Sequence, residues 1–286
     1  MVKRLLKVLR NWGFLFENKK FLIGIVILCS VWIVSSIGQF MTSYLLNKRF
    51  ALELPPSVEH PLGTDTLGKD ILAQLFIGTN TTLRIMFIAG ILGISIGMLV
   101  GFITGYYKRA TSSVLMSITD IFLVVPSLPL LILISSYVKV MDELTIALFL
   151  SIFNWAWPAR VIRAQVLSLK ERSFVLISKL SGLNDIEIIL REIAPNMLSF
   201  LGVNFMTATA GAALAEIGIE LLGLGLRHTY TLGTILYWAM YSAAVVKGKW
   251  WWWCPPVLML ILIFTSLFLI HTGLDEISNP RLREKG

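Results

Sequence analysis

Residues 83–107 read LRIMFIAGILGISIGMLVGFITGYY, an apolar run that contains one charged residue, Arg84. A helix of about 20 residues spans the roughly 30 Å hydrocarbon core of a bilayer, so this run is long enough to cross a membrane. Glycines at near-helical spacing let helices approach closely, and we expect these to pack within the subunit rather than to line a pore. They are Gly90, Gly93, Gly97, Gly101 and Gly105. The stretch predicts a membrane protein of closely packed helices.

Further apolar runs lie on both sides of this one. They cover residues 21–40, 112–138, 144–161, 197–224 and 250–271. Pro126 and Pro129 predict a kink in the third run. The aromatic run Trp250–Trp253 is typical of a membrane–water interface. We therefore predict an all-α, polytopic membrane protein with six transmembrane helices.

The composition favours the same class. Of the 286 residues, 56% are hydrophobic and 15% are charged, whereas soluble domains carry about 25% charged residues. The net charge of +8 comes from basic residues that flank the apolar runs. They do not alternate with aromatic residues on a polar face, so nucleic acid is not an expected partner. The two cysteines and three histidines show no CxxC and no metal-ligand spacing, which predicts neither a disulfide framework nor a metal site.

The positions of the basic residues predict how the chain is oriented. Most of the 25 lysines and arginines lie in residues 1–20, in the turn after residue 107, between the fourth and fifth runs, and in the tail. Loops that are rich in lysine and arginine face the cytoplasm. We therefore expect a multi-pass protein of the cell membrane with both termini in the cytoplasm. Its expected parts are a cytoplasmic segment (1–20), a first helix (21–40), an external loop (41–82), a core with five helices (83–271) and a cytoplasmic tail (272–286).

The longest predicted cytoplasmic loop, residues 160–196, reads RVIRAQVLSLKERSFVLISKLSGLNDIEIILREIAPN. Its first apolar residues at helical spacing are Phe174, Val175, Leu176, Ile177 and Leu180. Gly182 ends this pattern, and Asn184 or Asp185 is placed to cap a second amphipathic piece over residues 186–193. An apolar face outside the bilayer must bury against the membrane surface or against a groove on a partner protein.

The loop resembles that of the permease subunits of ABC importers, which has the form E-A-A-x-x-x-G followed by I-x-x-x-x-P. Gly182 matches the glycine, and residues 188–195 match the continuation. The resemblance is closest to the second permease type of the peptide/nickel branch and covers roughly residues 20–284. Four further stretches carry it, namely HPLGTDTLGKD at 60–70, Asp120 with Pro126, Ala215-Glu216 with Leu222–Gly225, and NPRLR at 279–283.

The chain also departs from the family pattern. The Glu-Ala-Ala positions are occupied by Leu176, Ile177 and Ser178. Without this glutamate, the contact with an ATPase subunit that the resemblance implies has one charge fewer. Lys69 replaces a usual arginine, and Glu220 stands where serine is common, one helical turn beyond Glu216.

The resemblance implies the type I ABC importer permease fold and a role as the membrane subunit of an ATP-driven importer. The partners that it implies are a second permease, two ATP-binding cassette subunits, an external substrate-binding protein and membrane lipids. The chain contains no P-loop motif G-x(4)-G-K-[ST]. We therefore expect no enzymatic activity and no cofactor in this chain, because ATP and Mg²⁺ would bind the partner subunits.

Three groups of candidate site residues follow from the resemblance. The ATPase-coupling residues, within segment 170–195, are Ser173, Phe174, Leu176, Ile177, Lys179, Leu180, Gly182, Asn184 and Asp185. The acids Asp120, Glu216 and Glu220 lie on the translocation path or at the interface between permeases, or else they bond to a neighbouring helix, for instance to Arg84. In the external loop, Asp65, Gly68 and Asp70 either contact the binding protein or form a turn that folds the loop.

The sequence leaves the substrate open. Oligopeptides are the usual substrates of this branch, while residues 232–238 and Trp250–Trp253 resemble members that carry oligosaccharides, and nickel or other metal chelates are a third choice. Two other classes remain as alternatives. A secondary transporter would show repeated halves with acids or broken helices at the membrane midplane. A membrane-embedded enzyme would need a convergent nucleophile or metal constellation.

Overall fold

The computed structural model describes residues 18–107, 110–138, 141–226 and 228–278. Over these residues the chain is helical, and its only β-type pairing is an isolated bridge between Thr64 and Asp70. The predicted all-α class is confirmed. The predicted basic N-terminal segment, apart from its last residues, and the NPRLR stretch lie outside the described residues.

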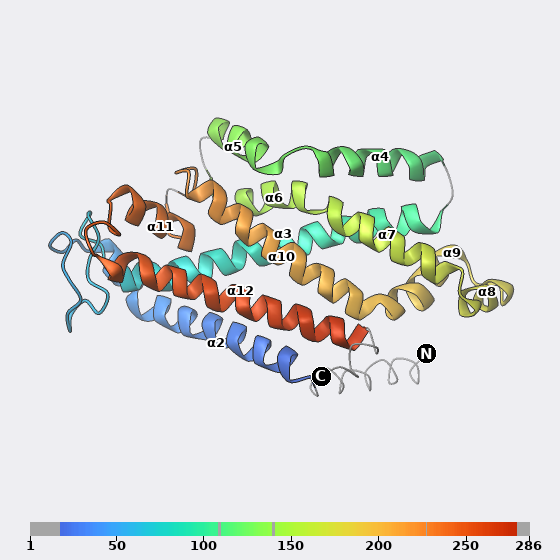
Figure 1. Ribbon diagram of the computed structural model, residues 1–286, viewed down its shortest axis with the longest axis horizontal. Coiled ribbons are helices and arrows are strands. Elements are labelled where there is room, and N and C mark those ends of the chain that lie inside the picture. Colours follow the sequence, from blue (N-terminus) through green and yellow to red (C-terminus); the bar gives the residue numbers. More distant parts are fainter. Residues whose placement is uncertain (1–17, 108–109, 139–140, 227, 279–286) are drawn as a thin grey trace.

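Four long helices run side by side along the length of the molecule (Figure 1). They are α2 (Lys19–Thr42), α3 (Ile71–Tyr106), α10 (Leu198–Glu220) and α12 (Trp250–Ser278). Each is part of a helical segment that is long and apolar enough to cross a membrane.

Two bent helix pairs complete the bundle. The first pair, α4 (Ala110–Val124) and α5 (Ser127–Tyr137), is bent by 83°. The second pair, α6 (Glu143–Asn154) and α7 (Ala156–Lys170), is bent by 44°. Pro126 explains the first bend, because proline lacks a backbone N–H and disfavours helix at the residue before it. The predicted kink is therefore confirmed, and if each pair is one span the described residues contain up to six spans, as predicted.

Short helices lie at the two ends of the bundle (Figure 1). One end, called the α8 end below, carries α8 (Ser173–Leu180), α9 (Asp185–Ile188), the π-helix η2 (Ile189–Ile193) and the 3₁₀ turn η3 (Ala194–Met197). The opposite end, the α11 end, carries the 3₁₀ turn η1 (Ser43–Asn47), the loop of residues 48–70 and α11 (Leu232–Tyr241).

The second helix begins earlier than the apolar pattern indicates. It starts at Ile71 rather than Leu83, because the side chain of Asp70 caps it by accepting from the backbone N–H of Ala73 at 2.9 Å. Its first turns carry polar residues that are buried by neighbouring segments, among them Gln74, Thr79, Asn80, Thr81 and Thr82. The helix therefore begins within the stretch, residues 41–82, that the sequence predicts as the external loop.

Three other predicted boundaries also differ. The sequence predicts residues 160–170 in a loop, but they form most of α7, in which Ile162 and Val166 are fully buried although Arg160, Arg163 and Lys170 are charged. The loop expected at 225–249 contains α11, and α12 continues beyond His271 to Ser278. In each case, packing against buried neighbours stabilises a helix that is too polar or too short to be recognised from the apolar pattern of the sequence.

The glycines of α3 form its contact with α7. A Cβ atom on Gly97 would lie 2.7 Å from Pro158 Cβ, and one on Gly101 would lie 2.8 Å from Ile162 Cβ. Gly105 makes the same kind of contact with Val166. Small residues of this kind allow two membrane helices to touch along their backbones. The expected packing role of these glycines within the subunit is confirmed.

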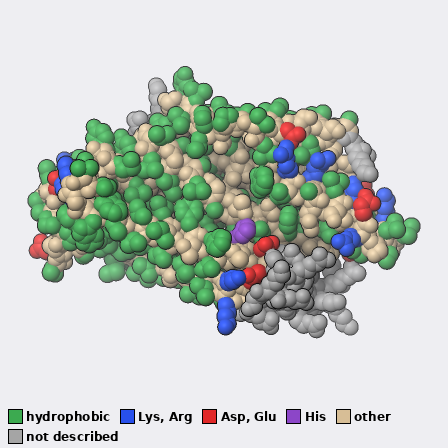
Figure 2. All heavy atoms as spheres, in the orientation of Figure 1, with side chains coloured by type: hydrophobic (Ala, Val, Ile, Leu, Met, Phe, Trp, Pro, Cys, Tyr) green, Lys and Arg blue, Asp and Glu red, His purple; other side chains and the backbone are tan. Residues whose placement is uncertain are grey.

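The surface is divided by residue type. Figure 2 shows hydrophobic side chains over much of the visible face, whereas charged side chains gather at the ends and over the half nearer α8. A band of exposed apolar side chains bounded by charged ends is the pattern of a protein surrounded by lipid or by other membrane subunits.

Candidate functional site

Helix α8 is attached to the bundle through one face. Val175 is buried with 4% of its surface exposed, and Phe174 is half-buried beside it. They pack in a cluster whose buried members come from α3, α7, α9, η2 and η3, namely Ile94, Ile162, Val166, Ile188, Ile193 and Met197. This cluster packs α8 against α7, α9 and η2.

The opposite face of α8 is apolar and exposed. The exposed fractions are 59% for Leu176, 62% for Ile177 and 80% for Leu180. Ile186 and Leu190, which follow in α9 and η2, are exposed to a similar extent. Ser173 and Lys179 are also exposed and border this face. Exposed apolar residues gathered at one place mark a surface that binds another molecule.

The turn between α8 and α9 has a defined backbone. Gly182 has φ +84°, a left-handed conformation that glycine adopts readily. The N–H of Gly182 donates to the carbonyl of Lys179 at 3.1 Å, and the N–H of Leu183 donates to that of Ser178 at 3.2 Å. Asn184 then caps α9, with its side chain accepting from the N–H of Glu187 at 2.8 Å. The predicted turn at Gly182 and cap at Asn184 are confirmed.

Polar contacts from α9 and from α7 reach the end of α3. The hydroxyl of Tyr106 donates to Asp185 Oδ1 at 2.9 Å. The ammonium of Lys170 donates to the carbonyls of Gly105 and Tyr106 at 3.0 and 3.2 Å. The Lys170 contacts join α7 to α3, whereas the segment from α8 to η2 is connected to the bundle by packing and by the Tyr106–Asp185 hydrogen bond.

The acid Asp120 is separate from the other two. It forms an ion pair with Arg160 between α4 and α7, and both side chains are about half exposed. The pair therefore lies on the surface of the bundle, on two of its helices rather than in a terminal loop. Polar groups at such positions usually face protein or a water-filled space rather than lipid.

Glu216 and Glu220 are both fully buried in α10, near the α11 end. The hydroxyl of Thr82 donates to Glu216 Oε1 at 3.3 Å, and the hydroxyl of Thr231 donates to Glu220 Oε2 at 2.6 Å. Arg84, which the sequence suggested as a partner, instead pairs with Glu143 at 3.0 Å. Bonding to neighbouring helices is therefore confirmed for both acids, but Arg84 is the wrong partner.

Asp65, Gly68 and Asp70 make their contacts within the external loop itself. Asp65 Oδ1 accepts from the N–H groups of Leu67 and Lys69, both at 2.8 Å. Gly68 has φ +71° and packs against the carbonyl of Phe50. Asp70, besides capping α3, contacts His60 Nδ1 at 2.8 Å through Oδ2. These contacts favour the interpretation that Asp65, Gly68 and Asp70 fold the loop.

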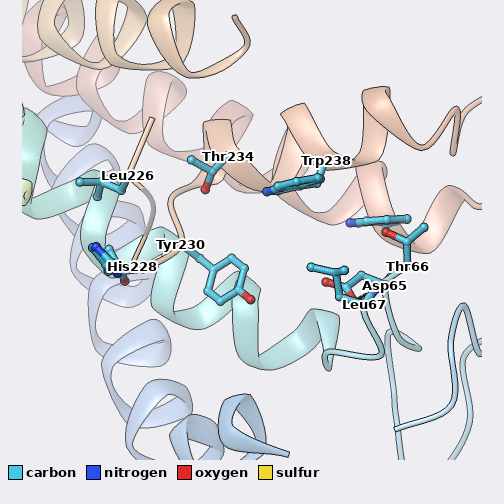
Figure 3. A pocket seen from close by; sticks show the side chains of 10 residues that line it. Asp65, Thr66, Leu67, Leu226, His228, Tyr230, Thr234 and Trp238 are labelled. Carbon is cyan, nitrogen blue, oxygen red and sulfur yellow. Dashed lines mark hydrogen bonds between the residues drawn. The ribbon is translucent and has the colours of Figure 1, made fainter. Parts of the chain in front are cut away.

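A cavity of about 190 Å³ lies between this loop and α11. In Figure 3 the ring of Tyr230 extends between the Leu226–His228 side of the cavity and the turn formed by Asp65, Thr66 and Leu67. Burial, together with the nearby carboxylate of Asp65, raises the pKa of the Tyr230 phenol above its ordinary value. Among the described residues no group of three or more His, Cys, Asp or Glu side chains is arranged to hold a metal ion.

Several residues that build these sites were not predicted from the sequence. Val175 anchors α8, and Thr82 and Thr231 bond the buried acids. The sequence does contain a signal for Thr231, because a threonine that precedes a second threonine by three residues can form a capping box, as it does at the start of α11. Thr82 had none, because its partner lies more than a hundred residues away in the chain.

Comparison with known proteins identifies the family. Residues 93–284 match the family described as binding-protein-dependent transport system inner membrane component. The dipeptide transport system permease protein DppC of Bacillus subtilis is 28% identical over 279 residues, which cover 95% of this chain and 85% of that protein.

Two oligopeptide transport system permease proteins named OppC are also similar. The one from Bacillus subtilis is 30% identical over 73% of this chain and 69% of its own length. The one from Mycobacterium bovis is 33% identical over 65% of each chain. The region that matches the family, residues 93–284, includes α8, the Gly182 turn and both buried acids. The chain therefore belongs to the family of binding-protein-dependent transport system inner membrane components, the permease subunits of ABC importers.

Proposed function

We propose that this chain is the subunit through which ATP-binding subunits drive an importer, and that α8 is the helix on which they act. The observation that carries the proposal is the face of Leu176, Ile177 and Leu180, which is apolar and exposed although it lies at a charged end of the molecule. A short amphipathic helix of this kind fits a hydrophobic groove on a partner protein. The partner in this case is an ATP-binding cassette subunit.

The attachment of α8 supports a mechanical role. Its buried face packs on α7 and α9, and the Tyr106–Asp185 hydrogen bond joins α9 to α3, so a displacement of α8 is transmitted to these helices. Closure of two ATPase subunits around ATP would move two such helices, one on each permease, and rock the bundles against each other. A second permease would complete the path, and hydrolysis would take place on the ATPases.

This function requires the α8 end to face the cytoplasm. The distribution of lysine and arginine supports that orientation, with the loop of residues 48–70 and α11 outside the cell. Both termini would then be cytoplasmic, and the α11 end would receive substrate from an external binding protein. The half-exposed Asp120–Arg160 pair would lie on the path or against the second permease, because lipid does not solvate such a pair.

Peptides are the substrates that we propose, since the relatives named above carry dipeptides or oligopeptides by their names. Oligosaccharides and metal chelates remain the alternatives. Binding of peptide, sugar and chelate panels to the external binding protein of the same transporter would decide among them. A binding protein that takes only sugars or chelates would contradict the peptide assignment but leave the coupling role intact.

Replacing Gly182 by valine is expected to lower substrate uptake by about tenfold or more. A β-branched residue at φ +84° costs about 1–3 kcal/mol of backbone strain, which displaces α8 from α9. A shift of 1.4 kcal/mol changes the occupancy of the docked position tenfold. Uptake by cells and ATP hydrolysis by the purified transporter are the measurements, and hydrolysis is expected to persist without uptake.

The matched control is Gly182→Asn, since asparagine tolerates the left-handed conformation. No atom lies within 4 Å of a Cβ added at this position, so the two variants differ in backbone strain rather than in contacts. Near-normal uptake is expected for Gly182→Asn. If Gly182→Val also transports normally, α8 is not the lever.

A further inference from the structure

Glu216 and Glu220 lie one helical turn apart in α10, and both carboxyl groups are in the interior. Residues four positions apart in a helix have Cβ atoms about 5–6 Å apart, and both side chains are completely shielded from solvent. Two ionised carboxylates at this separation repel each other and lose their hydration. The pair therefore needs a cation, a proton or a dense set of donors.

Among the described residues, one hydroxyl donates to each carboxyl group, the backbone of Thr234 also interacts with Glu220, and no cation is paired with either acid. Thr82 bonds Glu216 Oε1, and Thr231 bonds Glu220 Oε2. The other two oxygens, Glu216 Oε2 and Glu220 Oε1, are buried and have no hydrogen-bond partner there. Two buried carboxyl oxygens without a partner, one helical turn apart, point to a ligand that neither threonine supplies.

The N-terminus of α11 lies next to this pair. Thr231 is its N-cap and accepts from the N–H of Thr234 at 3.0 Å, while the N–H of Leu232 donates to Thr82 Oγ1 at 3.1 Å. The same two threonines thus contact the carboxyl groups and the first turn of α11. A helix N-terminus acts as about half a positive charge, which stabilises one negative charge nearby but not two.

The glycines around Glu220 leave little space. A Cβ atom on Gly233 would lie 2.3 Å from Glu220 Oε2, and one on Gly225 would lie 2.9 Å from Glu220 Cγ. The backbone therefore fits closely around this carboxyl group. A close fit favours a proton, which needs no room, over a hydrated metal cation.

We propose that Glu216 and Glu220 form a proton-binding site, in which the two carboxyl groups share one proton and carry a single negative charge that faces the N-terminus of α11. Carboxyl pairs that cannot both ionise share a proton in this way. The proton joins the two acids, and the remaining charge, through Thr82 and Thr231, fastens α11 to α3 and α10. This site is independent of the α8 docking proposal.

Single glutamine substitutions test the charge of the pair. Glu216→Gln or Glu220→Gln leaves one carboxylate and replaces the shared proton by an amide donor, so each variant keeps one negative charge. In lipid nanodiscs, we expect the melting temperature of each full-length variant to lie within about 3 °C of that of the parent protein. We also expect each melting temperature to be the same in sodium and in potassium buffer. Glu220→Ala, which removes the carboxyl group that accepts from Thr231 and empties a buried position, is the control that is expected to melt well below both.

The opposite pattern would overturn the proposal. If the acids held a cation, either glutamine variant would melt far below the parent, as the alanine variant does. Infrared difference spectra at neutral pH give a second reading that does not depend on stability. The parent is expected to show a protonated-carboxyl C=O band that both glutamine variants lack, and its absence from the parent would refute a shared proton.

Discussion

The variant Leu180→Asp is expected to lose substrate uptake by roughly a hundredfold while the subunit itself stays folded. Leu180 is 80% exposed, so the folded subunit loses little when it changes. In a docked complex the leucine would be buried. Its loss removes about 1.5–3 kcal/mol of apolar burial and places an unpaired charge in the groove. Together these effects amount to about 3 kcal/mol or more, which corresponds to roughly a hundredfold weaker docking.

The measurement is copurification of the ATPase subunits with the variant, together with uptake by cells. Val58→Asp is the matched control, because Val58 is a fully exposed apolar residue at the opposite end of the molecule. The control is expected to retain the ATPases. A Leu180→Asp transporter that retains them as well would show that this face is not the docking surface.

The second large effect is expected for Gly101→Leu in the contact between α3 and α7. A Cβ there would already lie 2.8 Å from Ile162 Cβ and 3.0 Å from the backbone carbonyl of Ala159, so a full leucine side chain cannot be accommodated without separating the helices. Overpacking costs about 1–3 kcal/mol or more, and here it falls on the central helix contact. We expect little folded protein.

Gly101→Ala should give an intermediate result, with a melting temperature several degrees lower. Gly218→Ala is the control, because its Cβ would meet only Leu128 Cδ2, at an ordinary 3.4 Å. At that position the helix preference of alanine over glycine, about 1 kcal/mol, is expected to leave stability equal or higher. Size-exclusion profiles after heating measure all three variants. Equal melting of Gly101→Ala and Gly218→Ala would mean that the α3–α7 contact is looser than described.

The sequence predicts the apolar part of the fold well, since long runs such as residues 21–40 can hardly be anything but membrane helices. It misses helices whose partners are distant. The start of α3 at Ile71 depends on the cap by Asp70 and on burial of polar residues by neighbouring segments. The charged residues within α7 hide the fact that Ile162 and Val166 pack on α3. Periodicity within one segment carries no information about such neighbours.

For the candidate site as well, the sequence predicts the features that depend on adjacent residues and misses those that depend on distant ones. Local signals located the Gly182 turn and the Asn184 cap, because both depend on a few adjacent residues. The face that α8 buries, through Val175, could not be told from the face that it exposes until its neighbours were placed. The partners of Glu216 and Glu220 come from α3 and from the start of α11, and only the folded chain brings them together.

Photo-crosslinking at position 180 tests the central claim most directly. A benzoylphenylalanine residue is placed at Leu180, and in a parallel strain at Val58, in cells that produce the whole transporter. If α8 docks on an ATP-binding cassette subunit, illumination gives an adduct with that subunit from position 180 and none from position 58. Adducts with lipid alone at position 180, or equal ATPase adducts from both positions, would contradict the docking of α8.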